Sequence, residues 1–176
     1  GNVIENKSQL IVNTPQSFSK LTGAKVLTKT EVTSVDTKAK TVKAIDLTTS
    51  QENTYTYDKL VIACGAAPVK PPIEGIDKDG VFYMRTPQDA ISLRERIESG
   101  EIKRAVVVGG GFIGIEVAEN LHKQNVKVSI VEMADTILPM FDEEFSLYME
   151  NSLADSGIMP FTKTQVVEIL GEDKVE

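Results

Sequence analysis

The stretch "RAVVVGGGFIGIEVAEN", residues 104–120, decides the fold of this chain. Four apolar residues lead into three consecutive glycines, a fourth glycine follows at position 114, and apolar residues then recur at helical spacing. An apolar run that turns through glycines into a helix is typical of a strand–turn–helix unit in a parallel sheet. Because the first N–H groups of a helix are unpaired and carry a partial positive charge, the stretch predicts a turn that binds a pyrophosphate.

The spacing of the glycines and of a later acid makes this prediction more specific. Gly109, Gly111 and Gly114 form a G-x-G-x-x-G pattern, and Glu132 ends the next apolar run 18 residues after Gly114. The first glycine permits the tight turn, the second admits a pyrophosphate, and the third lets helix and strand approach closely. A carboxylate at Glu132 accepts both ribose hydroxyls and repels a 2′-phosphate, and the adjacent "MAD" adds no basic residue. The pattern predicts NAD(H) in preference to NADP(H). A tight turn without a ligand is the alternative.

The residues around the motif predict a Rossmann-like α/β domain. The expected strands are 105–108, taken as buried, 127–132 and part of 158–170. The expected helices are 111–124, one that begins after Thr86 and ends at Gly100, and one that follows Asp142 and ends at Gly157. His122, the single histidine, is expected to be solvated near the end of its helix and to have no catalytic role.

The first hundred residues predict a smaller, strand-rich part. A short helix is expected from Pro15, capped by Thr14, to about Leu21, with Gly23 as its stop. Residues rich in β-branched and aromatic side chains then predict an antiparallel β-meander, with strands at 25–27, 31–36, 41–48 and 53–57. The apolar run "KLVIACGAAP", residues 59–68, predicts a strand buried on both faces. The proline-rich residues 67–77 predict an irregular connector.

Composition excludes several classes of function. A formal charge of −7 without a basic cluster argues against nucleic acid or an anionic membrane as partner. No apolar run approaches the roughly 20 residues of a membrane span, and the first residues do not resemble a signal peptide, so a cytoplasmic protein with a small-molecule partner is expected. A single cysteine, Cys64, excludes an internal disulfide framework and a cysteine-rich metal site.

Two longer stretches carry a resemblance to a known family. The stretch "KRAVVVGGGFIGIEVAENL", preceded by "YDKLVIACGAAPVKPPIEGI", resembles the flavin-dependent pyridine nucleotide–disulfide oxidoreductases. The opening "GNVIENKSQLIVNTPQSF" is similar to the branch of coenzyme A-disulfide reductases, NADH oxidases and NADH peroxidases. The resemblance covers essentially the whole chain. It implies a partial FAD-binding domain with the β-meander and connector at 1–102, and an NAD(H)-binding Rossmann-like domain, incomplete at its C-terminus, at 103–176.

The resemblance also implies what the chain lacks. Family members carry a FAD pyrophosphate motif and, in this branch, a redox cysteine upstream of the segment that matches Gly1. They also have a later acidic motif at the flavin and a C-terminal domain that forms a homodimer. We therefore expect an internal segment of a larger enzyme, with no catalytic residue of its own and no activity alone.

Site residues follow from the resemblance position by position. The NAD(H) site is expected to comprise Gly109, Gly110, Gly111, Phe112, Ile113, Gly114, Glu116 and Glu132. Phe112 matches an aromatic residue that lies over the flavin, and Glu116 matches an acid near the nicotinamide amide. A packing role for Phe112 and a favourable charge near a helix N-terminus for Glu116 are the alternatives. On the FAD side the matching residues are Val32, Cys64, Gly65 and Ala66. A core residue of its strand is the alternative for Val32.

The implied function is transfer of a hydride from NADH to FAD and then of electrons to a disulfide, peroxide or oxygen. A flavin-dependent ferredoxin-type reductase is one alternative, and a non-catalytic module that senses NADH is another. Cys64 is expected to be a buried structural thiol and not the redox cysteine, because it follows an apolar run.

Overall fold

Two three-stranded sheets form the framework, one antiparallel and one parallel. A computed structural model describes residues 7–176, so the first six residues, where the family resemblance begins, lie outside the described residues. The chain divides into two compact units, with the boundary between Ala66 and Ala67. The predicted α/β class, with a parallel βαβ sheet and a separate meander, is confirmed. The functional domains at 1–102 and 103–176 stay a prediction.

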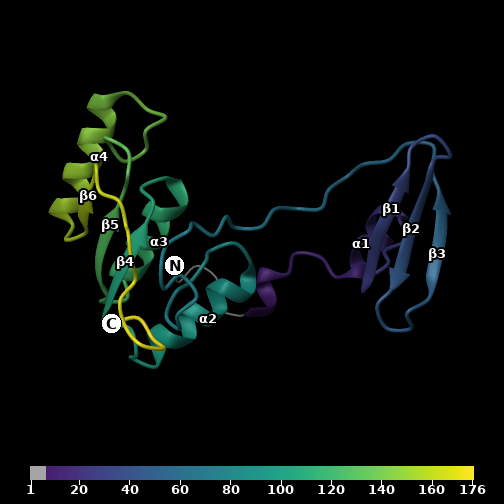
Figure 1. Ribbon diagram of the computed structural model, residues 1–176, viewed down its shortest axis with the longest axis horizontal. Helices are drawn as coiled ribbons and strands as arrows, with labels where there is room; N and C mark the ends of the chain where they lie inside the picture. Colours follow the sequence, from purple (N-terminus) through teal and green to yellow (C-terminus); the bar gives the residue numbers. More distant parts are fainter. Residues whose placement is uncertain (1–6) are drawn as a thin grey trace. The chain divides into compact units, whose positions relative to one another are not determined.

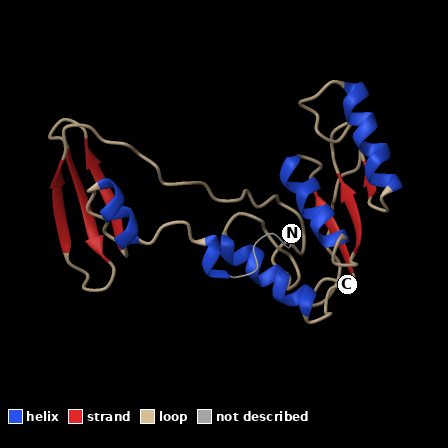
Figure 2. Ribbon diagram, turned by 180° about the vertical axis from the view of Figure 1, so that it is seen from behind, coloured by secondary structure: helices blue, strands red, loops and turns tan. Residues whose placement is uncertain are grey.

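The first unit is a meander with one helix on one side of it (Figures 1 and 2). A single 3₁₀ turn, η1 (Lys7–Leu10), precedes α1 (Pro15–Thr22). The strands are β1 (Thr30–Asp36), β2 (Thr41–Asp46) and β3 (Glu52–Thr56). The predicted helix and three of the four predicted meander strands are confirmed, but Lys25–Leu27 is not a strand.

Helix α1 forms because its ends are encoded locally. The Thr14 hydroxyl accepts the Ser17 N–H, and the Ser17 hydroxyl accepts the Thr14 N–H, which completes a capping box. Pro15 occupies the first helical position, where its missing N–H is not needed. Gly23 ends the helix in the left-handed region, with φ of +73°.

The predicted strand at 59–68 is wrong. These residues have no regular secondary structure, and Val61 is 85% exposed. An apolar run forms a strand only when neighbouring strands offer hydrogen-bond partners. No such partner pairs with residues 59–68 within the described part of the chain. Residues 67–73 are also irregular, as the connector prediction requires.

The second compact unit contains the strand, glycine turn and helix predicted from residues 104–120. The first helix of this compact unit is α2 (Pro87–Glu98), which has a capping box between Thr86 and Asp89. Its remaining elements follow in the order β4 (Arg104–Val108), α3 (Phe112–His122), β5 (Lys127–Val131), α4 (Glu143–Asp155) and β6 (Met159–Phe161). The strands lie side by side in the order β4-β5-β6 and are parallel (Figure 1). This confirms the predicted βαβ arrangement.

The hydrophobic core lies between α3 and the parallel sheet. Its centre is formed by Ile115, Ala118 and Leu121 of α3 with Val128 and Ile130 of β5. Residues from other elements complete the cluster: Val126, Ile137, Leu138, Leu153 and Ile158. Since Ile130 is fully buried at the middle of the sheet, the core fixes the C-terminal end of β5 against α3.

Two predictions about burial in this unit need correction. His122 is only partly exposed, since its Nδ1 atom is buried and has no hydrogen-bond partner among the described residues. Its ring lies against Gly157, where an added Cβ would be 3.2 Å from His122 Cε1. Strand β4 is not buried on both faces, since Val106 and Val108 are exposed.

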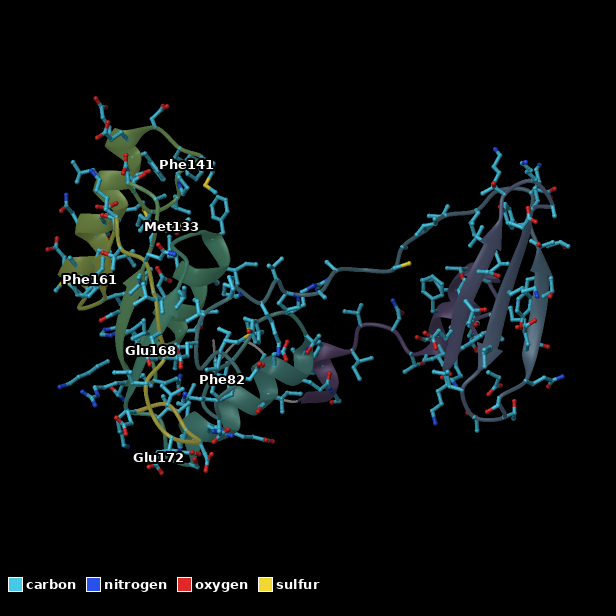
Figure 3. All side chains as sticks on the ribbon, in the orientation of Figure 1. Phe82, Met133, Phe141, Phe161, Glu168 and Glu172 are labelled. Atoms are coloured by element: carbon cyan, nitrogen blue, oxygen red, sulfur yellow. The ribbon has the colours of Figure 1, made fainter. Side chains whose placement is uncertain are left out.

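The exposed side of β4 continues across the sheet. The register places Val106 beside Ser129 and Met159, and Val108 beside Val131 and Phe161. Because side chains opposite one another in neighbouring strands share a face, these residues form one surface, on which Figure 3 labels Phe161. Met159 and Phe161 are exposed as well. The described residues therefore leave much of this apolar face open.

An ion network connects α2 to the C-terminal segment. Arg96 of α2 donates two hydrogen bonds to the Asp79 carboxylate and lies 3.6 Å from Glu101, which in turn accepts from Lys174. The backbones of the two segments also meet, since Val175 N–H donates to Asp79 O at 2.9 Å. The hydrogen bond from Arg96 lowers the pKa of Asp79, and the one from Lys174 lowers the pKa of Glu101.

These lowered pKa values predict acid-sensitive stability. Each carboxyl binds its proton less tightly in the folded chain than in the unfolded chain, so it stabilises the fold above its ordinary pKa. This stabilisation is lost as the pH falls through the lowered folded-state pKa. We expect the melting temperature to drop between about pH 5 and pH 3, more steeply at low salt. Asp79→Asn should flatten this part of the profile, and an unchanged profile would contradict the prediction.

Candidate dinucleotide-binding site

The glycine turn between β4 and α3 is built from glycines with different structural tasks. Gly109 has φ of +111°, which favours glycine, and its N–H donates to Val131 O at 2.8 Å. A Cβ at Gly114 would lie 2.0 Å from the Gly109 carbonyl oxygen, so only glycine permits this close approach. A Cβ at Gly111 would meet nothing within 4 Å. Gly111 therefore leaves open space in front of the turn.

Helix α3 presents its first N–H groups beside this space. Gly111 is its N-cap residue and has no side chain that could accept a hydrogen bond from them. These N–H groups are the usual donors to a phosphate at a helix N-terminus. The turn and the helix end together can hold an anion that approaches the backbone.

Glu132 is held at the C-terminal end of β5 by its backbone and its carboxylate. Its Oε2 accepts the Gly110 N–H at 2.7 Å, and its Oε1 accepts the Ala134 N–H at 2.7 Å. Its backbone N–H donates to Phe161 O, and its carbonyl accepts from Thr164. Each carboxylate oxygen still has a lone pair for a further donor. The carboxylate can therefore accept two hydroxyl groups in a fixed geometry.

Large apolar side chains surround the start of α3. Phe112 is 61% exposed, and Ile113 is also exposed. The Phe112 ring meets Phe141 edge-on, with 5.7 Å between ring centroids, and Phe141 contacts Phe145. Figure 3 labels Phe141 in the loop before α4. Glu116 is exposed one turn after Phe112, so the two residues lie on the same side of the helix.

Lys163 is a charged neighbour of the site that the sequence analysis missed. Its N–H donates to Ala134 O at 2.9 Å, and its Nζ lies 3.9 Å from the Asp135 carboxylate. The residues that follow β6 thus bring a cation to the segment after Glu132. The motif could not reveal this contact, because Lys163 is distant in sequence, although the predicted return of 158–170 to the sheet placed it near β5.

The four residues expected on the FAD side lie in the first unit. Val32 is on β1, the edge strand of the meander, beside an irregularity in its pairing with β2. Cys64, Gly65 and Ala66 lie in the irregular segment after β3. Cys64 is exposed, so the expectation that it is buried is wrong for the same reason as the strand at 59–68.

Residues 7–176 contain neither a candidate metal site nor a candidate membrane-spanning helix. No group of three or more His, Cys, Asp or Glu side chains in this range is arranged to hold a metal ion. No helix within the same range has both the length and the apolar character to span a membrane.

Comparison with known proteins finds a matching family and many relatives of this chain. The family described as "Pyridine nucleotide-disulphide oxidoreductase" matches residues 2–176. The chain is 37% identical over 174 residues to an NADH oxidase of Methanocaldococcus jannaschii, an alignment that covers 98% of this chain and 39% of the relative. The chain therefore spans about two fifths of the length of this curated relative.

Solved structures have the same arrangement of elements. An NAD-dependent persulfide reductase from A. fulgidus superposes with a TM-score of 0.85 at 39% identity, over 93% of this chain and 30% of that one. The water-forming NADH oxidase from Lactobacillus brevis, bound to NADH, gives 0.85 at 30% identity, over 96% and 37% of the two chains. Its engineered NADPH oxidase form, bound to NADPH, gives 0.84 at 29% identity, over 96% and 37%.

Proposed function

Because this chain belongs to the pyridine nucleotide-disulphide oxidoreductase family, we propose that residues 103–176 bind NADH and present its nicotinamide to a flavin. The observation that carries the proposal is the anchored Glu132 carboxylate, which lies beside the open glycine turn. The pyrophosphate lies over Gly111 and the start of α3, and Glu132 accepts the hydroxyls of the adenosine ribose. NADH supplies the hydride, and the protein supplies binding and orientation.

The engineered Lactobacillus brevis oxidase supports this assignment of Glu132. Its five substitutions fall on a glycine, an aspartate 18 residues later, and positions one, two and seven residues after the aspartate. In this chain the same spacing runs from Gly114 to Glu132, Met133, Ala134 and Pro139. In that oxidase the aspartate is replaced by alanine and two of the other positions by arginine, and the protein binds NADPH. An acid at the place of Glu132 therefore suits NADH.

We extend the proposal to FAD and to the complete reaction. The outer edge of β1 has no partner strand within the described residues, so backbone groups near Val32 are open to an adenine. Cys64, Gly65 and Ala66 are exposed and available to line a flavin. In a complete enzyme, Phe112 would lie beside the flavin and Glu116 near the nicotinamide amide. A bound flavin would take the hydride from NADH and pass its two electrons to a disulfide, peroxide or oxygen.

Titration of the purified chain with NADH and with NADPH tests the binding step. We expect NADH to bind at least about tenfold more tightly, because a 2′-phosphate would face the Glu132 carboxylate. Calorimetry gives both dissociation constants. Equal affinities, or tighter binding of NADPH, would refute the role of Glu132. In a complete flavoprotein that contains this segment, NADH should bleach the flavin absorbance, whereas a sensor without catalysis would show no bleaching.

A further inference from the structure

The segment Ile137–Leu138 connects α4 to the glycine turn by three hydrogen bonds. Leu138 N–H donates to Gly110 O at 2.9 Å. The Ser146 hydroxyl of α4 donates to Leu138 O at 3.3 Å, and Glu150 Oε1 of α4 accepts the Ile137 N–H at 3.1 Å. We call these five residues the clasp.

Ile137, Leu138 and Ser146 of the clasp are buried, and the Leu138 backbone is strained. Ile137 is 0% exposed, Leu138 is 3% exposed, and Ser146 is the only fully buried polar side chain among the described residues. Leu138 has φ of +47°, a left-handed conformation that leucine rarely adopts. Such a conformation persists only where the surroundings hold it, and strain of this kind gathers at functional sites. The hydrogen bonds from α4 and the burial of both side chains provide that hold.

The clasp limits where Gly110 can lie. The carbonyl of Gly110 is bound by Leu138, and its N–H is bound by the Glu132 carboxylate. An added Cβ at Gly110 would be 2.9 Å from Ile137 Cγ2, so the Ile137 side chain packs directly against the Gly110 Cα. Gly110 lies between Gly109 and Gly111, over which the proposed function places the pyrophosphate. The geometry of the turn and of Glu132 therefore depends on α4.

We propose that Ser146 and Glu150 are positioning residues that set the affinity for NADH without touching it. This inference rests on the proposed function. Each side chain fixes the Ile137–Leu138 backbone, which fixes Gly110 and, through it, the Glu132 carboxylate. Loss of either bond lets the turn sample positions in which the phosphate and ribose contacts do not form together.

Four variants test the clasp. Ser146→Ala and Glu150→Leu each remove one bond, whereas Glu150→Gln keeps an oxygen that can accept the Ile137 N–H. Ser152→Ala is the matched control, because Ser152 is exposed on the same helix. Hydrogen exchange reports on the amides of residues 109–112 without any ligand, and calorimetry gives the dissociation constant for NADH. Thermal melting shows that each variant is folded.

We expect faster exchange at 109–112 and about fivefold weaker NADH binding in Ser146→Ala and in Glu150→Leu. Glu150→Gln and Ser152→Ala should stay near the wild type in both measurements. Unchanged exchange at 109–112 in both disruptive variants would overturn the clasp, as would an equal loss of affinity in Glu150→Gln and Glu150→Leu. If the wild type binds no NADH, the proposed function fails, and the exchange data still decide whether the clasp holds the turn.

Discussion

Replacing Glu132 by alanine should weaken NADH binding about 10- to 100-fold, which corresponds to about 1.4–2.8 kcal/mol. The variant loses two charge-assisted hydrogen bonds to the ribose. It also leaves the N–H groups of Gly110 and Ala134 without their acceptor, so the turn is less well held. NADPH should lose less or bind more tightly, since the carboxylate no longer repels its 2′-phosphate and Lys163 lies beside Ala134.

The ratio of the two dissociation constants is the decisive measurement. Glu132→Gln separates the loss of the negative charge from the loss of the acceptor that holds the turn. It removes the charge and keeps an acceptor oxygen for a backbone N–H. Asp155→Ala is the control, since Asp155 is an exposed acid at the C-terminal end of α4. If Glu132→Ala left the NADH to NADPH ratio at the wild-type value, the assignment of this carboxylate to the ribose would be wrong.

Alanine at Gly111 should chiefly weaken NADH binding, whereas alanine at Gly114 should chiefly destabilise the fold. Gly111 has φ of −81° and free space around its Cβ position, so Gly111→Ala should cost less than about 1 kcal/mol of unfolding free energy. Its methyl group occupies the space of the pyrophosphate, so NADH affinity should fall more than about tenfold. Gly114→Ala places its methyl against the Gly109 carbonyl and should cost about 1–3 kcal/mol of unfolding free energy.

Denaturant unfolding and NADH calorimetry on Gly111→Ala and Gly114→Ala check these two predictions. The engineered Lactobacillus brevis oxidase has alanine at the glycine with the same spacing and binds NADPH, so in Gly114→Ala we expect the turn to shift and not to collapse. A strongly destabilised Gly111→Ala variant, or a Gly111→Ala variant with wild-type affinity, would contradict the placement of the pyrophosphate.

Elements with local signals could be predicted from the sequence. The caps at Thr14 and Thr86 and the glycine turn depend on residues a few positions apart, and the structure confirms these elements. The run at 59–68 could not be predicted correctly, because a strand depends on partners that the local pattern does not reveal.

In the candidate site, too, some features could be predicted from the sequence and others could not. The open space at Gly111 and the position of Glu132 at the end of β5 follow from motif spacing. The contacts of Lys163, Ser146 and Glu150 join segments that only the folded chain brings together. Nothing in the motif indicates that α4 holds the glycine turn.

The two sheets differ in how far apart along the chain their partner strands lie. In the meander, only residues 37–40 separate β1 from β2, and residues 47–51 separate β2 from β3. In the parallel sheet, β4 and β5 meet only after α3 has formed a crossover, and β5 and β6 only after α4. Closing a longer loop costs more entropy before any contact is gained, and pairing between distant strands is intrinsically slow. The meander therefore has the lower entropic barrier to assembly, and the glycine turn reaches its binding geometry in the slower-forming sheet.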